Sequence, residues 1–87
     1  MTGKEERQLQ KARNSKAGWM PQELIDLYES YGFIVREGKG SHKVISHPEF
    51  RDLRAIIPVH PGEQPKIYVS KAVQHIDELL KRQKRSD

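Results

Sequence analysis

The sequence predicts an α+β fold in which a three-stranded antiparallel sheet is covered on one face by two helices. Two apolar stripes with helical spacing, one early and one late in the chain, indicate the helices. Three short runs of strand formers lie between them, and consecutive strands joined by short turns pair as an antiparallel meander. With 87 residues the chain is one domain, and so small a core depends on every element that covers it.

The first helix of this unit is predicted to begin at Pro21, because the fixed φ of proline suits the first helical turn. Its apolar stripe has i, i+3, i+4, i+7 spacing and consists of Leu24, Leu27, Tyr28 and Tyr31. Gly32 is expected to end this helix as a left-handed cap. An additional helix over about Glu5–Arg13 is compatible with the sequence, provided that another element covers Leu9.

The three strands are expected over residues 33–36, 42–46 and 53–59. Gly38–Ser41 is short and glycine-rich, which favours a tight antiparallel hairpin between the first two strands. In the third strand the apolar residues alternate, so one face carries Leu53, Ala55, Ile57 and Val59. Pro58 lacks an N–H group and therefore belongs near a strand end or on an edge strand.

The last helix is predicted to begin at Ser70, a good N-cap residue, and to run to about Arg82. Its apolar stripe is expected to contain Val69, Val73, Ile76 and Leu80, with Ala72 and Leu79 beside them. The resulting order of helix, three strands and helix is also that of the double-stranded-RNA-binding domain. Element order alone says little about function.

The net charge of +4 is unevenly placed along the chain. Residues 1–17 and residues 81–87 each carry +3, whereas the stretch between them carries −2. Two basic ends favour a polyanionic partner such as RNA, since phosphate contacts supply most non-specific affinity. A solvated helix start and a frayed tail would give the same pattern, so both interpretations stay open.

Several classes of chemistry are excluded or disfavoured by what the sequence lacks. There is no cysteine, which excludes disulfides, a thiolate nucleophile and zinc–thiolate sites. No histidine pair has the helical i, i+4 spacing of metal ligands, and no phosphate-binding glycine loop is present, so we expect neither a metal nor a cofactor. No apolar run is long enough for a membrane span and the N-terminus lacks a secretory signal, which makes the cytoplasm the expected compartment.

The segment with the most chemical potential is Gly38–Lys43. Gly40 lets the backbone approach a phosphate, Ser41 can donate to phosphate oxygens, and Lys39 and Lys43 add positive charge on either side. His42 is the side-chain type that exchanges protons near neutral pH. RNA cleavage needs a base, an acid and cations around phosphorus. The plainer alternative is a hairpin turn with an exposed histidine, and spacing alone favours that alternative.

The remaining histidines are weaker candidates. His60 follows the third strand and is a second acid/base candidate, but its distance from the hairpin depends on a strand register that the sequence does not fix. Otherwise it is a turn residue before Pro61. His47, which precedes Pro48, is expected to be structural, and His75 to be a half-exposed helix position.

Residues 31–42 resemble the signature of the HicA toxin family. The shared features are Gly32-Phe33 at the end of a helix and Gly40-Ser41-His42 before the second strand, followed by His47-Pro48, by a strand running through Pro58 to His60, and by Lys66 before the last helix. The resemblance covers about residues 19–82. It assigns residues 1–18 to a basic N-terminal extension and residues 83–87 to a basic tail.

The resemblance implies a small endoribonuclease toxin that cleaves mRNA, with the double-stranded-RNA-binding fold and a catalytic histidine at His42. It also implies a HicB-like antitoxin that binds the toxin and blocks its active face, so that any oligomer would form through the antitoxin. We interpret Lys39, Gly40, Ser41 and Lys43 as substrate contacts and the chemistry as metal-independent. The rival hypotheses are a non-catalytic RNA-binding module of the same fold and a protein-interaction domain whose core a partner completes.

Overall fold

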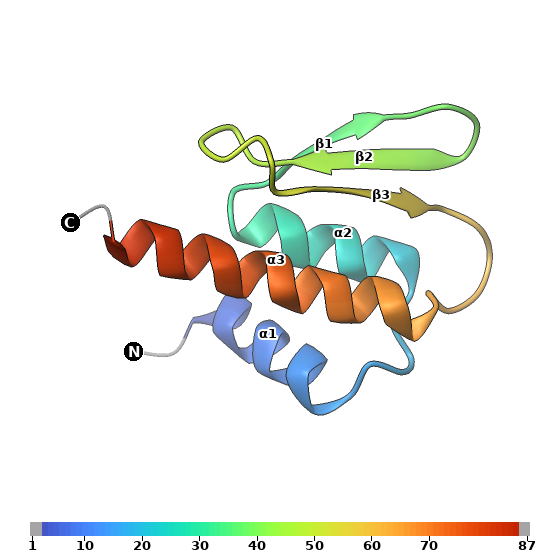
Figure 1. The fold of residues 1–87 in the computed structure, drawn as a ribbon. Coiled ribbons are helices and arrows are strands. Elements are labelled where there is room, and N and C mark those ends of the chain that lie inside the picture. The colour runs from blue at the N-terminus through green and yellow to red at the C-terminus, as the bar shows by residue number, and fades with distance from the viewer. Residues whose placement is uncertain (1–2, 86–87) are drawn as a thin grey trace.

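The computed structural model describes residues 3–85 and confirms the predicted class of fold (Figure 1). The helices are α1 (Lys4–Asn14), α2 (Pro21–Ser30) and α3 (Lys66–Arg85), and the strands are β1 (Ile34–Glu37), β2 (His42–Ser46) and β3 (Arg54–Pro58). The sheet is antiparallel with the order β1-β2-β3, so β2 is its central strand. The order from α2 to α3 is therefore α-β-β-β-α, and α1 is an additional helix in front of it.

The sheet separates a covered face from an open one. In Figure 1, α2 and α3 lie on one side of the strands, and none of residues 3–85 forms a helix on the other side. Side chains alternate along each strand, so that Ile45 of β2 and Ile57 of β3 point toward the helices and are buried. Their neighbours Val44 and Ile56 therefore point to the open face, where the register makes them cross-strand partners.

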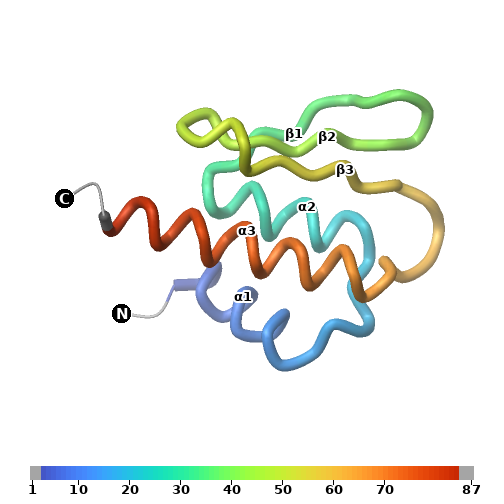
Figure 2. The backbone as a smooth tube through the Cα atoms, viewed as in Figure 1, coloured from blue at the N-terminus to red at the C-terminus, as the bar shows by residue number. Residues whose placement is uncertain are grey.

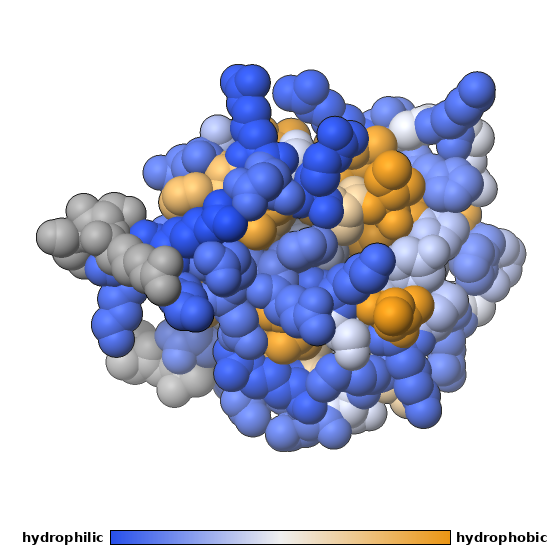
Figure 3. Space-filling model, viewed as in Figure 1, coloured by the Kyte–Doolittle hydropathy of each residue, from blue (hydrophilic) through white to orange (hydrophobic). Residues whose placement is uncertain are grey.

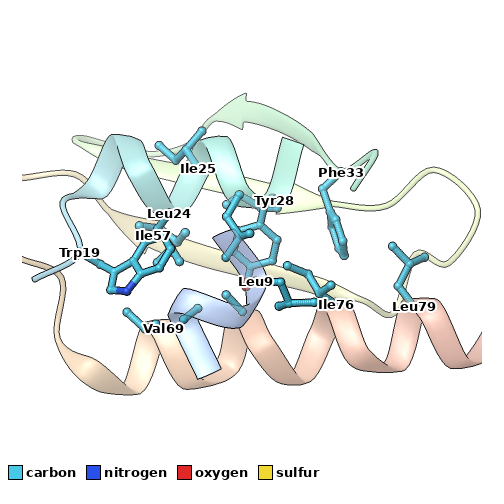
Figure 4. Packing of buried hydrophobic residues seen from close by; sticks show 14 of the residues in the cluster. Leu9, Trp19, Leu24, Ile25, Tyr28, Phe33, Ile57, Val69, Ile76 and Leu79 are labelled. Carbon is cyan, nitrogen blue, oxygen red and sulfur yellow. The ribbon is translucent and has the colours of Figure 1, made fainter. Parts of the chain in front are cut away.

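The hydrophobic core lies between the sheet and the helices. Its largest fully buried side chains are Trp19, Tyr28, Leu24, Ile45, Ile57, Ile76, Leu79 and Val69. Figure 4 shows Leu24 and Tyr28 of α2, Ile57 of β3, and Val69 and Ile76 of α3 gathered in the space between these elements, with Leu9 of α1 joining them. Burying a side chain of this size stabilises the fold by roughly 1.5–3 kcal/mol, so even a short strand is held firmly by one inward residue.

Helix α1 packs on α3 and α2 on the side away from the sheet, as the tube in Figure 2 shows. Leu9 is 4% exposed and Ala12 is fully buried, so the condition for this helix, that another element should cover Leu9, is met. Arg13 forms an ion pair with Asp77 of α3, and the Lys11 ammonium lies 5.1 Å from the Trp19 ring centroid. At least these two cations of the basic N-terminal arm therefore serve the fold.

The ends of α2 follow the sequence prediction. Pro21 is its first residue, and the backbone N–H of Met20 donates to the Glu23 carboxylate at 2.9 Å. Gly32 has φ +89°, the left-handed conformation expected of the residue that caps the helix. On the third strand, Leu53 and Ile57 are buried and β3 ends at Pro58 on the edge of the sheet, which confirms both expectations for that segment.

The prediction that α3 begins at Ser70 is wrong, because the helix begins at Lys66. The Tyr68 N–H donates to the Pro65 carbonyl at 3.0 Å and starts the first turn. Gln64 anchors the chain just before it, since its N–H donates to the Trp19 carbonyl at 2.6 Å and its side chain to the Pro58 carbonyl at 2.8 Å. These hydrogen bonds, one to the distant Trp19 and one to the end of β3, fix the chain just before the helix starts.

In α3, the two residues expected beside the stripe, Ala72 and Leu79, are buried more deeply than Val73 and Leu80, which were expected within it. The fully buried positions are Val69, Ala72, Ile76 and Leu79, whereas Leu80 is 37% exposed. Helix α3 is contacted by both α2 and α1, so the surface that it buries is broader than a stripe facing one layer.

Candidate active site at the open end of the sheet

The turn between β1 and β2 is a tight hairpin closed by backbone hydrogen bonds. The Gly38 N–H donates to the His42 carbonyl at 2.8 Å, and the His42 N–H donates to the Lys39 carbonyl at 3.3 Å. Gly40 has φ +65°, and such a left-handed conformation costs other residues about 1–2 kcal/mol. Glycine at this position therefore lets the turn expose Ser41 and the side chain of Lys39.

His42 is the first residue of β2 and is exposed on the open face of the sheet. Its ring Nδ1 lies 3.0 Å from the Lys39 carbonyl oxygen. A carbonyl can only accept, so this hydrogen bond requires Nδ1 to carry the proton. The neutral ring then keeps its lone pair on Nε2, and this nitrogen is the one able to accept a proton from a bound molecule.

The strand register brings His60 to the same end of the sheet. His42 is paired with Pro58, and one residue further the Val59 N–H donates to the Ser41 carbonyl at 2.8 Å. His60 therefore comes next to the glycine turn, and Figures 1 and 2 show that turn and the loop after β3 at one end of the molecule. The His60 ring is exposed, and its Nδ1 lies 3.2 Å from the Pro61 carbonyl oxygen.

The two lysines beside His42 are placed differently. Lys39 is exposed in the turn, and no ion pair within residues 3–85 involves it. Lys43 alternates to the covered face and forms an ion pair with Glu37, its cross-strand partner on β1. The structure thus brings together the His42 ring, Lys39, Gly40, Ser41 and the His60 loop, and it separates Lys43 from them.

A hollow of about 450 Å³ occupies the other end of the open face. Its lining residues are Ile34, Arg36, Val44, Ser46, His47, Pro48, Arg51 and Arg54. Figure 3 shows apolar side chains in orange reaching the surface between hydrophilic ones in blue in the upper part of the molecule, where the sheet lies in Figure 1. Sequence reasoning did not single out these arginines. The usable signal was that Arg36 follows the half-buried Val35 and Arg54 follows the buried Leu53, so alternation places both arginines on the opposite face.

The other two histidines serve the fold. His47 is buried, accepts at Nδ1 from the Glu49 N–H at 3.1 Å, and packs edge-on against Phe33 with ring centroids 5.0 Å apart. His75 is half-buried, and its Nδ1 lies 3.1 Å from the Tyr28 hydroxyl oxygen. Burial lowers the pKa of His75 and raises that of Tyr28. Neither ring lies beside the glycine turn that carries His42.

Neither a metal-binding cluster nor a membrane-spanning helix is found among residues 3–85. Within that span no three His, Asp or Glu side chains gather closely enough to hold a metal ion. None of the helices in the same span combines the length and the apolar character needed to cross a bilayer.

A three-stranded meander with helices on one face and an exposed Gly-Ser-His turn on the other fits the small toxins of bacterial toxin–antitoxin pairs. Residues 21–82 match the family model described as HicA toxin of bacterial toxin-antitoxin systems. This match spans most of the chain, which therefore belongs to the HicA toxin family, and membership implies an antitoxin partner. No curated protein and no solved structure matches the chain. The match begins at the first residue of α2, so α1 lies outside it.

Proposed function

We propose that this HicA-family toxin is an endoribonuclease that cleaves mRNA in the cytoplasm without a metal ion, with His42 as the group that moves the proton. The observation that carries the proposal is the hydrogen bond from His42 Nδ1 to the Lys39 carbonyl, 3.0 Å long, on an exposed ring. It orients the imidazole and leaves Nε2 available to a substrate, which is the arrangement that a general base requires.

The reaction proceeds by attack of the RNA chain on itself. Nε2 of His42 takes the proton of a 2′-hydroxyl, and the 2′-oxygen forms a bond to the adjacent phosphorus. The bond from phosphorus to the 5′-oxygen breaks, and the leaving oxygen takes a proton from a second group. The products are a 2′,3′-cyclic phosphate and a 5′-hydroxyl. Lys39 and the Ser41 hydroxyl stabilise the charge that builds on the phosphoryl oxygens.

His60 is the best candidate for the second proton-transfer group, because it is an exposed imidazole beside the glycine turn. A protonated His60 ring keeps its Nδ1 hydrogen bond to the Pro61 carbonyl and still donates from Nε2. A base and an acid of this kind give a bell-shaped dependence of rate on pH. Lys43 is left out of the contact set because its ammonium is paired with Glu37 on the covered face.

A HicB-like antitoxin inhibits the toxin by covering the open face of the sheet, His42 included. Two features support that part of the proposal. The open face exposes large apolar side chains, with Ile34 41% and Ile56 52% exposed. Strands β1 and β3 are both edge strands, which offer unpaired backbone groups to a partner.

The proposal is tested by incubating a long single-stranded RNA with the purified protein in excess EDTA. Wild type should cleave it, His42→Ala should be slower by about 10²–10⁴-fold, and His60→Ala should be impaired as well. Gln74→Ala, an exposed change on α3, is the control and should cleave like wild type. Wild-type rates for His42→Ala, or cleavage that EDTA abolishes, would contradict the proposal. RNA that is bound but left intact by every variant would indicate a binding module.

A further inference from the structure

The hollow on the open face, here called the arginine hollow, has a lining of one charge. It is lined by Arg36 of β1, Arg54 of β3 and Arg51 from the β2–β3 loop, and no Asp or Glu lines it. These arginines are exposed, and within residues 3–85 none of their guanidinium groups has an ion pair or hydrogen bond. Three like charges around one hollow, without a local counterion, favour an anionic ligand.

Two other arginines of the chain behave differently. Arg82 binds Asp52 through two hydrogen bonds of 2.8 Å, and Arg13 pairs with Asp77. Those contacts hold α3 to the β2–β3 loop and to α1. The three arginines of the hollow contribute nothing comparable to the fold, so their guanidinium groups are available to a ligand from outside.

The floor of the hollow is apolar. Ile34 is 41% exposed there, beside Val44 and Pro48. A ligand that satisfies both parts of the lining carries anionic groups and flat apolar surface together. Nucleotides of single-stranded RNA have this composition, since the phosphates meet guanidinium groups and the unstacked base lies on apolar surface or on the guanidinium plane. A duplex keeps its bases inside and presents only phosphates to such a floor.

The hollow lies on the same face of the sheet as the proposed active site. His42 and Ser46 lie on the same face at the two ends of β2, about 13 Å apart at the usual rise per residue. Arg36 is paired with Val44, midway between them, and Arg54 is paired with Ser46. Positive charge therefore follows β2 from the histidine to the hollow, over a distance that a short stretch of RNA spans.

We infer that the arginine hollow binds nucleotides flanking the cleavage point of a single-stranded RNA, with their phosphates on Arg51 and Arg54 and a base on the apolar floor. This inference rests on the proposed function, because it takes the scissile phosphate to lie at His42. The distance along β2 from the hollow to His42 sets the length of RNA that the toxin contacts. Arg36 lies between the two ends of this stretch and contacts the RNA there.

Binding is measured in the His42→Ala background, so that the RNA stays intact. A short labelled single-stranded oligoribonucleotide is titrated by fluorescence anisotropy at several salt concentrations. Arg51→Gln and Arg54→Gln should each weaken binding roughly tenfold and reduce the slope of log K against log salt by about 0.7. Ile34→Ser should weaken binding while leaving that slope unchanged, because it removes apolar contact and no charge.

Lys71→Gln is the matched control, since it removes an exposed cation on α3, in the layer of helices behind the sheet, and should bind like the parent. Equal affinities for all variants would overturn the inference, as would stronger competition by a duplex of the same sequence. Binding of an acidic peptide through the arginines, with no binding of RNA, would overturn it in favour of a protein ligand. RNA binding that depends on the arginines, together with no cleavage by wild type, would support the hollow and contradict the proposed catalysis.

Discussion

The covered and the open face of this sheet are built from the same three strands, yet they have different tasks. Ile45 and Ile57 point toward the helices and are at most 1% exposed. The residues next to them in the chain point the other way, and there the sheet carries His42, Arg36 and Arg54. Because side chains alternate along a strand, one residue can stabilise the core while its neighbour lies on the face that carries the candidate site. Variants on the two faces should therefore fail in different assays.

The largest effect is expected on the open face. His42→Ala should lower the rate of RNA cleavage by about 10²–10⁴-fold, because it removes the proposed base. Its melting temperature should match that of wild type, since the ring is exposed and its one hydrogen bond within residues 3–85 is to the carbonyl of a turn residue, Lys39. Thermal melts and single-turnover cleavage of the same preparation check both parts. A large drop in melting temperature would mean that His42 serves the fold as well.

The covered face should give the opposite result. Ile57→Ala removes a side chain that is 1% exposed and should lower the free energy of unfolding by about 2–5 kcal/mol. Ile56→Ala is the matched control, because its side chain is 52% exposed on the open face and should change stability by less than about 0.5 kcal/mol. Urea unfolding of the two proteins measures the difference. Similar losses for both would contradict the assignment of faces.

Gly40 tests how the turn supports the site. Gly40→Ala should cost about 1–2 kcal/mol of stability, because a side chain must adopt φ +65° although nothing crowds it. It should also slow cleavage, since a rearranged turn moves the Lys39 carbonyl away from the His42 ring. Ser41→Ala, at a residue without positive φ, should leave the unfolding free energy unchanged. Equal stability of the Gly40 variant and wild type would contradict a requirement for the left-handed conformation at this position.

The smallest effect concerns pH. Burial, and next the Lys71 ammonium, lower the pKa of His75 below its ordinary value of 6.5. Well above pH 6.5 the ring is neutral in both the folded and the unfolded state, so its titration does not change the free energy of unfolding. As the pH falls from 6.5 toward the lower folded pKa, the unfolded chain gains a proton that the native ring does not, so stability decreases. Stability curves of wild type and His75→Gln should run parallel above pH 6.5 and converge or cross below it. Curves that stay parallel throughout would contradict this prediction.

The features predicted correctly from the sequence are those set by local pattern. The start of α2 at Pro21, the cap at Gly32, the hairpin at residues 38–41 and the alternation of β3 all depend on neighbours within a few residues. The start of α3 was missed because it depends on Gln64, whose N–H is bonded to Trp19, far away in the sequence, and whose side chain is bonded to Pro58 at the end of β3.

The candidate site was predictable only in part, for the same reason. The glycine turn and His42 are contiguous in the chain, so their proximity needs no tertiary knowledge. The place of His60 required the register of β2 with β3, and the arginine hollow required both strand pairings and the β2–β3 loop. The placement of Lys43 on the covered face, by contrast, follows from alternation and was within reach of the sequence.

The central claim, that the toxin makes the 2′-hydroxyl of RNA attack its own phosphate, is tested most directly by one change in the substrate. An RNA oligonucleotide with a mapped cleavage point is compared, in excess EDTA, with the same strand carrying a single 2′-deoxy nucleotide at that point. Wild type should cut the first to a 2′,3′-cyclic phosphate and a 5′-hydroxyl and leave the second intact. Cleavage of the deoxy strand at the same point, or products with a 5′-phosphate, would contradict the account.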